Sequence, residues 1–157
     1  MEIERKWLID ENNIPYNLND YEFWDIEQAY ISFEPTIRIR KISNKNEFIL
    51  TIKSSSKDED GLAKQEYEIN ISEDQYNDLL QKREGIVLEK TRYRVKDDYL
   101  LEIDIFHNEY EGLAYMEVEF ESIEQAKAYM PPNWVGKELT NDHRYSNASL
   151  ARRTFKI

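Results

Sequence analysis

The chain has 157 residues, of which 40% are hydrophobic and 13% aromatic, a composition that indicates a folded globule and argues against a disordered chain. Acidic residues outnumber basic residues 32 to 21, and the net charge of −11 disfavours general binding to nucleic acid or to an anionic membrane. No cysteine occurs, which excludes disulfides, thiolate catalysis and cysteine-based metal sites. We expect a single domain over residues 1–157 with a cytoplasmic location, because the sequence shows no signal-like segment and no apolar run of about 18 residues.

Eight stretches of the chain alternate apolar and polar residues, which is the two-residue period of a β-strand. In the first stretch, Glu2, Glu4 and Lys6 share one face, while Ile3 and Trp7 lie on the other. Turn-forming Asn, Asp and Gly residues separate several neighbouring stretches, as they do in β-hairpins. The expected strands are residues 1–9, 23–32, 36–42, 48–53, 64–71, 87–95, 99–106 and 114–120.

Three helices are expected in the remaining segments. Ser72 followed by Gln75 is a capping box that opens the first helix, and Gly85 stops it. A second capping box opens a helix that ends before Pro131, and a third helix starts near Asn141.

The charges on the expected strands segregate by sign. Taken singly, each strand also fits an ordinary sheet with helices on its apolar face and water on its charged face. Solvated faces usually mix the two signs, because adjacent like charges repel. A divalent cation stabilises paired carboxylates, with Mg²⁺ or Mn²⁺ as the oxygen-preferring choice, and a polyanion stabilises paired cations. The acidic sets are Glu66 with Glu68, Glu102 with Asp104 and Glu117 with Glu119, and the basic sets are Arg38 with Arg40 and Lys90 with Arg92 and Arg94.

This pattern predicts an α+β fold, with a closed or nearly closed eight-stranded antiparallel β-barrel and helices packed outside. Such a barrel would be inverted, with a polar lumen and an apolar exterior, and eight strands leave room for one small ligand. A cationic wall facing an acidic wall suits a metal-bound oligophosphate, since Arg and Lys bind phosphate oxygens without any glycine-rich loop.

The ordered motifs resemble those of one known family. They are Glu2-x-Glu4-x-Lys6, Arg38-x-Arg40, Thr51-Ile52-Lys53, Glu66-x-Glu68, Lys90-x-Arg92, Glu102-x-Asp104, Glu117-x-Glu119 and Gly136-Lys137-Glu138-Leu139-Thr140. In this order they resemble the CYTH superfamily of triphosphate tunnel metalloenzymes, and specifically its compact bacterial members of the CyaB–thiamine triphosphatase type. The resemblance spans nearly the whole chain and implies an eight-stranded tunnel that acts on inorganic tripolyphosphate, thiamine triphosphate, RNA 5′-triphosphate ends or ATP. The sequence departs from the family pattern at Lys64 and Ala29, where many members have Arg and Gly.

The resemblance also implies roles for particular residues. The metal ligands, for one or two Mg²⁺ or Mn²⁺ ions, would be Glu2, Glu4, Glu66, Glu68, Asp104, Glu117 and Glu119. The phosphate contacts would be Lys6, Arg38, Arg40, Lys53, Lys90 and Arg92. Glu4 would be catalytic, with Lys6 or Lys137 assisting proton transfer, and the segment from Asp142 to Asn147 resembles the start of a helix that plugs the tunnel.

The expected function is metal-dependent hydrolysis of a short linear triphosphate, with inorganic tripolyphosphate as the leading substrate and a monomer or homodimer as the acting species. The alternatives are a class IV adenylate cyclase, a thiamine triphosphatase and a non-catalytic module that binds polyphosphate or nucleotide. We interpret His107 and His143 as surface residues and Trp7 and Trp24 as core residues.

Overall fold

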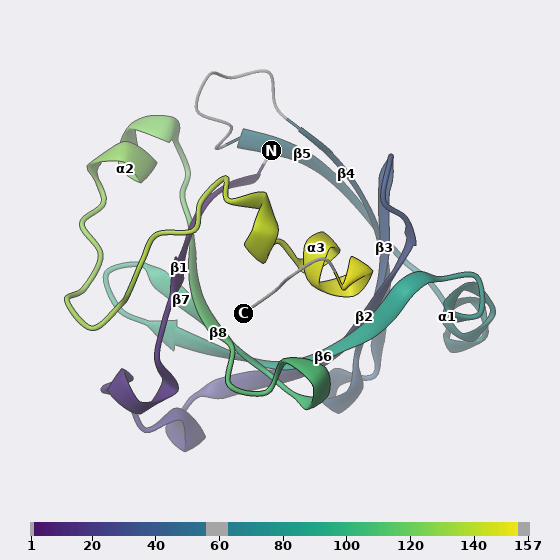
Figure 1. Cartoon of the computed structure of the whole chain (residues 1–157), viewed down its shortest axis with the longest axis horizontal. Helices are drawn as coiled ribbons and strands as arrows, with labels where there is room; N and C mark the ends of the chain where they lie inside the picture. The colour runs from purple at the N-terminus through teal and green to yellow at the C-terminus, as the bar shows by residue number, and fades with distance from the viewer. Residues whose placement is uncertain (1, 56–62, 154–157) are drawn as a thin grey trace.

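The computed structural model describes residues 2–55 and 63–153. Eight antiparallel strands form a closed barrel in the order β1-β5-β4-β3-β2-β6-β7-β8 (Figure 1). The strands are β1 (Glu2–Leu8), β2 (Glu22–Ser32), β3 (Thr36–Ile42), β4 (Glu47–Ser55), β5 (Ala63–Asn70), β6 (Glu84–Lys96), β7 (Leu100–Phe106) and β8 (Ala114–Glu119). The predicted α+β fold with an eight-stranded antiparallel barrel is confirmed.

The apolar core lies outside the wall of the barrel. Trp7, Ile103 and Met116 are buried in one large cluster that also contains the buried Ala126 of the helix α2 (Ile123–Ala128). Arg92 and Asp104 are paired across β6 and β7 and are also buried, but they alternate with the apolar residues and so face the other side of the wall. The fold is therefore an inverted barrel, with charge inside and apolar packing outside.

Two helices pack on the outer surface, as predicted. The helix α1 (Glu73–Leu80) has the expected capping box between Ser72 and Gln75, and it buries Tyr76 against Phe48 and Ile39 of the adjoining strands. The helix α2 is capped by Ser122. Within the described residues, no helix is both long enough and apolar enough to span a membrane.

The third helix starts later than predicted. The segment after Asn141 first forms a short 3₁₀ turn, and α3 (Asn147–Arg152) begins only after Ser146. Ser146 has extended backbone angles, and its side chain accepts a hydrogen bond from the Ser149 amide, so it is the N-cap that sets the helix start. Figure 1 shows α3 in the middle of the ring of strands, in the plug position that the family resemblance implies.

The prediction that Gly85 stops α1 is wrong. The helix ends at Leu80, and Gly85 lies in β6 beneath α3. Its φ of 74° belongs to the left-handed region, and a Cβ there would lie only 2.2 Å from the backbone carbonyl oxygen of Ala151. The missing side chain lets the plug helix approach β6 closely. Leu150 and Ala151 are then fully buried against residues of the barrel wall such as Leu88.

Candidate active site

The lumen is a cavity of about 1630 Å³ that receives side chains from all eight strands and from the segment leading into α3. Twelve of the fourteen predicted site residues line it, namely Glu2, Glu4, Lys6, Arg38, Arg40, Lys53, Glu66, Glu68, Lys90, Arg92, Glu117 and Glu119. Asp104 and Lys137 do not line it. The alternation seen in the sequence therefore brings residues from distant strands into one cavity.

The basic wall consists of buried cations on two strands. Arg38 and Arg40 lie on β3, Lys90 and Arg92 lie on β6, and all four are at most 9% exposed. Burial, and then the positive charges of Arg38 and Arg92, lower the pKa of Arg40 from its ordinary value, although a guanidinium remains charged at neutral pH. The Nε atom of Arg38 is buried without a hydrogen-bond partner in the described structure. These cations are arranged for an anion that enters the lumen.

Asp104 holds two of these cations and is itself fully buried. Its Oδ1 accepts a hydrogen bond from Arg92 Nε at 2.7 Å, and its Oδ2 accepts from Lys90 Nζ at 2.8 Å and from Arg92 Nη2 at 2.9 Å. Burial opposes ionisation of this carboxyl, but Arg92 and Lys90 outweigh it and hold the pKa of Asp104 well below its usual range. Both oxygens are engaged by these cations, so Asp104 is the counter-ion of the basic wall, and its role as a metal ligand stays a prediction.

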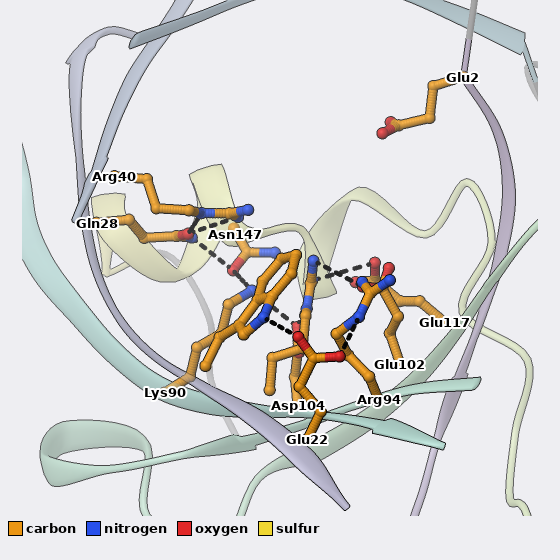
Figure 2. Close-up of polar contacts among 12 residues, drawn as sticks. Glu2, Glu22, Gln28, Arg40, Lys90, Arg94, Glu102, Asp104, Glu117 and Asn147 are labelled. Atoms are coloured by element: carbon orange, nitrogen blue, oxygen red, sulfur yellow. Dashed lines mark hydrogen bonds and ion pairs between the residues drawn. The ribbon is translucent and has the colours of Figure 1, made fainter. Parts of the chain in front are cut away.

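The acidic wall consists of carboxylates on β1, β5 and β8. Glu117 lies at its edge, 3.6 Å from Arg92 of the basic wall, whereas Figure 2 shows Glu2 on the other side of the lumen, apart from the Lys90–Asp104 group. Glu4 pairs with Glu119 across β1 and β8. Burial, followed by the charge of Glu4, raises the pKa of Glu2 to about 8. Burial raises the pKa of Glu119 as well. Burial opposes ionisation of Glu66 and Glu117 too, but hydrogen bonds with Glu68 and Glu2 lower the pKa of Glu66 to about 2, and the charge of Arg92 lowers the pKa of Glu117. The wall therefore combines ionised carboxylates with carboxyls that retain a proton more readily.

Two carboxylate oxygens on this wall lack hydrogen-bond partners. Oε1 of Glu2 and Oε2 of Glu66 are buried, and their nearest recorded cation is Lys53 Nζ, at 3.7 Å and 3.6 Å. At neutral pH Glu2 carries a proton, since its pKa is raised to about 8, and a hard cation such as Mg²⁺ can replace that proton between the two carboxyls. Across residues 2–55 and 63–153, no three acidic or histidine side chains are grouped closely enough to form a complete metal site. Mg²⁺ usually takes one or two carboxylates and completes its shell with water and substrate phosphate, so the two observations agree.

The two predicted catalytic lysines differ in position. Lys6 lines the cavity, and its Nζ donates to the carbonyl oxygen of Tyr145 at 3.0 Å and lies 4.6 Å from the ring centroid of Tyr115. Lys137 is exposed and does not line the cavity, and its backbone carbonyl accepts a hydrogen bond from the amide of Leu8. The structure thus leaves Lys6 as the lysine of the pair that faces the lumen.

Several residues of the lumen were not predicted. Trp24, expected in the core, lines the cavity with its ring 4.5 Å from the Arg94 guanidinium. His143, expected on the surface, is exposed but also lines the cavity. Gln28 and Asn147 contact the basic wall and carry no charge, so the sign pattern gave no signal for them. Gln28 could have been found from strand pairing, because it lies directly opposite Arg40.

These features define a class of protein, the closed antiparallel β-barrel whose lumen is lined by buried cations and by carboxylates. The CYTH domain family model matches residues 1–155 of the chain. The chain therefore belongs to the CYTH family.

Individual relatives agree with this assignment. The inorganic triphosphatase of Nitrosomonas europaea is 38% identical over 154 residues, which cover 96% of each chain. The inorganic triphosphatase of Acetivibrio thermocellus is 33% identical over 133 residues, which cover 82% of this chain and 81% of the relative. A crystal structure of an inorganic triphosphatase matches with a TM-score of 0.68 and 35% identity, over 97% of this chain and 95% of its own. A putative adenylyl cyclase from Hippeastrum with a dominant triphosphatase activity has a TM-score of 0.66 over 100% of this chain and 98% of its own, and at 16% identity it shares the fold alone.

Proposed function

We propose that this protein is a metal-dependent triphosphatase that hydrolyses inorganic tripolyphosphate to diphosphate and orthophosphate. The observation that carries the proposal is the row of buried cations on β3 and β6, which faces a row of carboxylates across one cavity. The relatives named inorganic triphosphatases support the same reaction.

The basic wall suits phosphoryl transfer because this chemistry depends mainly on alignment and charge stabilisation. Arg38, Arg40 and Arg92 present planar donors to phosphate oxygens, and their burial strengthens each contact relative to water. Water attacks the terminal phosphorus, the bridging P–O bond breaks, and diphosphate departs with the bonding electrons. The cations stabilise the charge that develops on the departing oxygen.

The acidic wall is the proposed site for one or two Mg²⁺ or Mn²⁺ ions. The residues that would hold them are Glu2, Glu4, Glu66, Glu68, Glu117 and Glu119. When bound, such an ion neutralises phosphate charge and lowers the pKa of a coordinated water. Glu2 and Glu66 fit this role because their buried oxygens have no hydrogen-bond partner within the described structure.

Lys6 is the residue that we propose to assist the departing diphosphate. Its ammonium is held at the plug end of the cavity by the Tyr145 carbonyl oxygen and the Tyr115 ring. From there it can neutralise or protonate a phosphate oxygen. Lys137, the other predicted candidate, does not line the cavity, so we propose Lys6 for this role.

A second candidate is hydrolysis or cyclisation of an organic triphosphate such as thiamine triphosphate or ATP. The observation that favours it is Trp24, an aromatic side chain on the cavity that an inorganic substrate does not need, although Arg94 and Lys45 lie against its ring.

Substrate and metal are tested together. The purified protein is incubated with tripolyphosphate, ATP or thiamine triphosphate in Mg²⁺, in Mn²⁺ or in EDTA, and orthophosphate, diphosphate and cyclic AMP are measured. We expect fastest phosphate release from tripolyphosphate and none in EDTA. Cyclic AMP formed from ATP would establish the cyclase instead, and tight binding without turnover on any substrate would establish a binding module.

Removal of one guanidinium from the basic wall should weaken substrate binding more than turnover. An Arg40→Ala variant loses a charge-assisted phosphate contact, so we expect KM for tripolyphosphate to rise about 10-fold to 100-fold with a smaller change in kcat. Steady-state kinetics measure both constants. Lys41→Ala, on the opposite face of the same strand, is the control and should keep the wild-type KM. An unchanged KM in Arg40→Ala would remove Arg40 from the substrate site.

The acidic wall should make the metal-free protein less stable as the pH rises. The folded state raises the pKa of Glu2 from 4.5 to about 8, so between these values it binds a proton that the unfolded chain has released. Stability should therefore fall from about pH 5 to about pH 7 in EDTA. At higher pH, Lys90 has the opposite effect on stability. Burial lowers its pKa to about 7, so above this value the unfolded chain binds a proton that the folded state has released, and stability rises with pH.

Mg²⁺ should reverse this loss, because an ion on the carboxylates replaces the proton and binds only the folded state. Thermal unfolding at pH 5 and pH 7, with EDTA or with Mg²⁺ at matched ionic strength, measures the effect. An unfolding temperature at pH 7 that Mg²⁺ leaves unchanged would argue against a metal site on this wall.

A further inference from the structure

The plug helix contacts the basic wall through its first residue. Asn147 lines the cavity, and its Oδ1 accepts hydrogen bonds from Gln28 Nε2 at 2.9 Å and from Lys90 Nζ at 3.3 Å (Figure 2). Gln28 in turn accepts two hydrogen bonds from Arg40, from Nε at 3.0 Å and from Nη2 at 2.8 Å. One continuous chain of hydrogen bonds therefore joins a cation on β3, the plug and a cation on β6.

The direction of the hydrogen bonds in this chain is set by Arg40, which stands at one end and can only donate. Lys90 stands at the other end, and its ammonium form donates to Asp104 as well as to Asn147. Arg40 therefore requires the oxygen of Gln28, which turns the Gln28 amide nitrogen toward Asn147. The oxygen of Asn147 must then face both Gln28 and Lys90, so neither amide can flip without placing two donors together.

Burial makes this chain of hydrogen bonds rigid. Gln28 is 0% exposed and Lys90 is 1% exposed, so water offers little substitute for a lost protein partner. The Lys90 ammonium lies between Asp104 on β7 at 2.8 Å and Asn147 on the plug at 3.3 Å. Without Asn147, Asp104 would be the one hydrogen-bond partner left to the Lys90 ammonium within the described residues. Gln28 would lose the acceptor that orients it.

We propose that Asn147 is a positioning residue for substrate, which aligns Arg40 through Gln28 and Lys90 directly, so that both cations face the same part of the triphosphate. The role gives the plug helix a part in substrate binding beyond closing one end of the tunnel. The inference rests on the proposed function, since it takes the anion that the two cations meet to be a triphosphate.

A double-mutant cycle tests this role. Asn147→Ala and Asn147→Ser both withdraw the amide oxygen, and Ser keeps a small polar side chain at this position if Ala impairs folding. Gln28→Leu removes the middle link of the hydrogen-bond chain, and the variant that carries both substitutions completes the cycle. The dissociation constant for tripolyphosphate is measured by calorimetry in EDTA, and KM and kcat are measured in Mg²⁺. Arg152→Ala, exposed on the same helix, is the control.

We expect each single variant to weaken tripolyphosphate binding about tenfold or more, with a rise in KM and a smaller change in kcat. The double variant should bind no more weakly than the weaker single variant, because both substitutions break one chain of contacts. The variants should unfold at a lower temperature than Arg152→Ala, because each leaves a buried donor without its partner. Their loss of affinity should persist well below the unfolding temperature, where a purely structural role in seating the plug predicts wild-type affinity.

Wild-type affinity in the Asn147 variants, or strictly additive losses in the double variant, would overturn the proposal while leaving the triphosphatase intact. Wild-type protein that binds tripolyphosphate but does not hydrolyse it would overturn the proposed function, and the binding cycle would still decide the role of Asn147. Wild-type protein that does not bind tripolyphosphate would overturn both.

Discussion

An Asp104→Asn variant is expected to lower the free energy of unfolding of the ligand-free protein by about 3–5 kcal/mol, because it removes the one carboxylate that both buried cations contact within 3 Å, while Glu102 and Glu117 remain 3.6 Å from Arg92. Asp104 accepts hydrogen bonds from both Arg92 and Lys90, and none of these side chains has appreciable contact with solvent. The substitution keeps the shape of the side chain and removes only its charge. Urea unfolding of both proteins at neutral pH measures the difference.

Tripolyphosphate should restore part of this loss, because an anion in the lumen supplies the missing negative charge and binds only the folded state. The matched control is Glu109→Gln, which breaks the solvent-exposed ion pair with Arg153 and should leave stability nearly unchanged. Equal stability of Asp104→Asn and wild type would show that Lys90 is neutral in the folded protein or that the buried ion pairs contribute little.

A Glu4→Gln variant is expected to lose at least about 100-fold in turnover while keeping or gaining stability in the metal-free state. Glu4 lines the lumen opposite Glu119, and its charge is one of the causes that raise the pKa of Glu2. Removing that charge relieves repulsion on the acidic wall and weakens the hold on a metal ion. The rate of phosphate release and the unfolding temperature in EDTA should therefore change in opposite directions.

Glu124→Gln, on the exposed face of α2, is the control for the same chemical change away from the lumen. It should keep wild-type turnover and stability. The acidic wall would lose its proposed catalytic role if Glu4→Gln hydrolysed tripolyphosphate at the wild-type rate. A large drop in stability would instead assign Glu4 a structural role.

Much of the lumen could be predicted from the sequence, because the face on which a strand residue lies is a local property. Glu66 and Glu68, or Arg38 and Arg40, are two residues apart and must share a face whatever the strand order. The segregation of their signs then indicated an enclosed face. The antiparallel barrel and the sharing of one cavity by most of the predicted residues follow from this pattern and from the family resemblance.

The partners within the lumen could not be predicted in the same way. Alternation places Asp104 on the inner face but does not say that Arg92 is its neighbour, which depends on the pairing of β6 with β7. Trp24 alternates as a core residue of an ordinary sheet would, and only the pairing of β2 with β6 places it opposite Arg92 in the lumen. Such contacts depend on strand register between distant segments, which a single sequence does not specify.

The position of α3 could not be predicted from the sequence either, because it also depends on contacts between distant segments. The start of this helix depends on the side chain of Ser146, and its docking depends on the absence of a side chain at Gly85, about sixty residues earlier in the chain. The sequence interpretation assigned Gly85 to the end of α1, because a glycine after a helical pattern is usually a local stop signal. Here it is a long-range contact with Ala151.

The inverted arrangement of the barrel separates what keeps the protein folded from what selects its substrate. Trp7, Ile103 and Met116 pack outside the wall, so most lumen residues can be exchanged without opening a void in the apolar core. Among the charged residues discussed, Asp104 is the one whose substitution is expected to lower the free energy of unfolding of the whole domain. Such a tunnel can acquire new substrates over evolutionary time by substituting lumen residues one at a time, while the outer shell that holds the strands together stays the same.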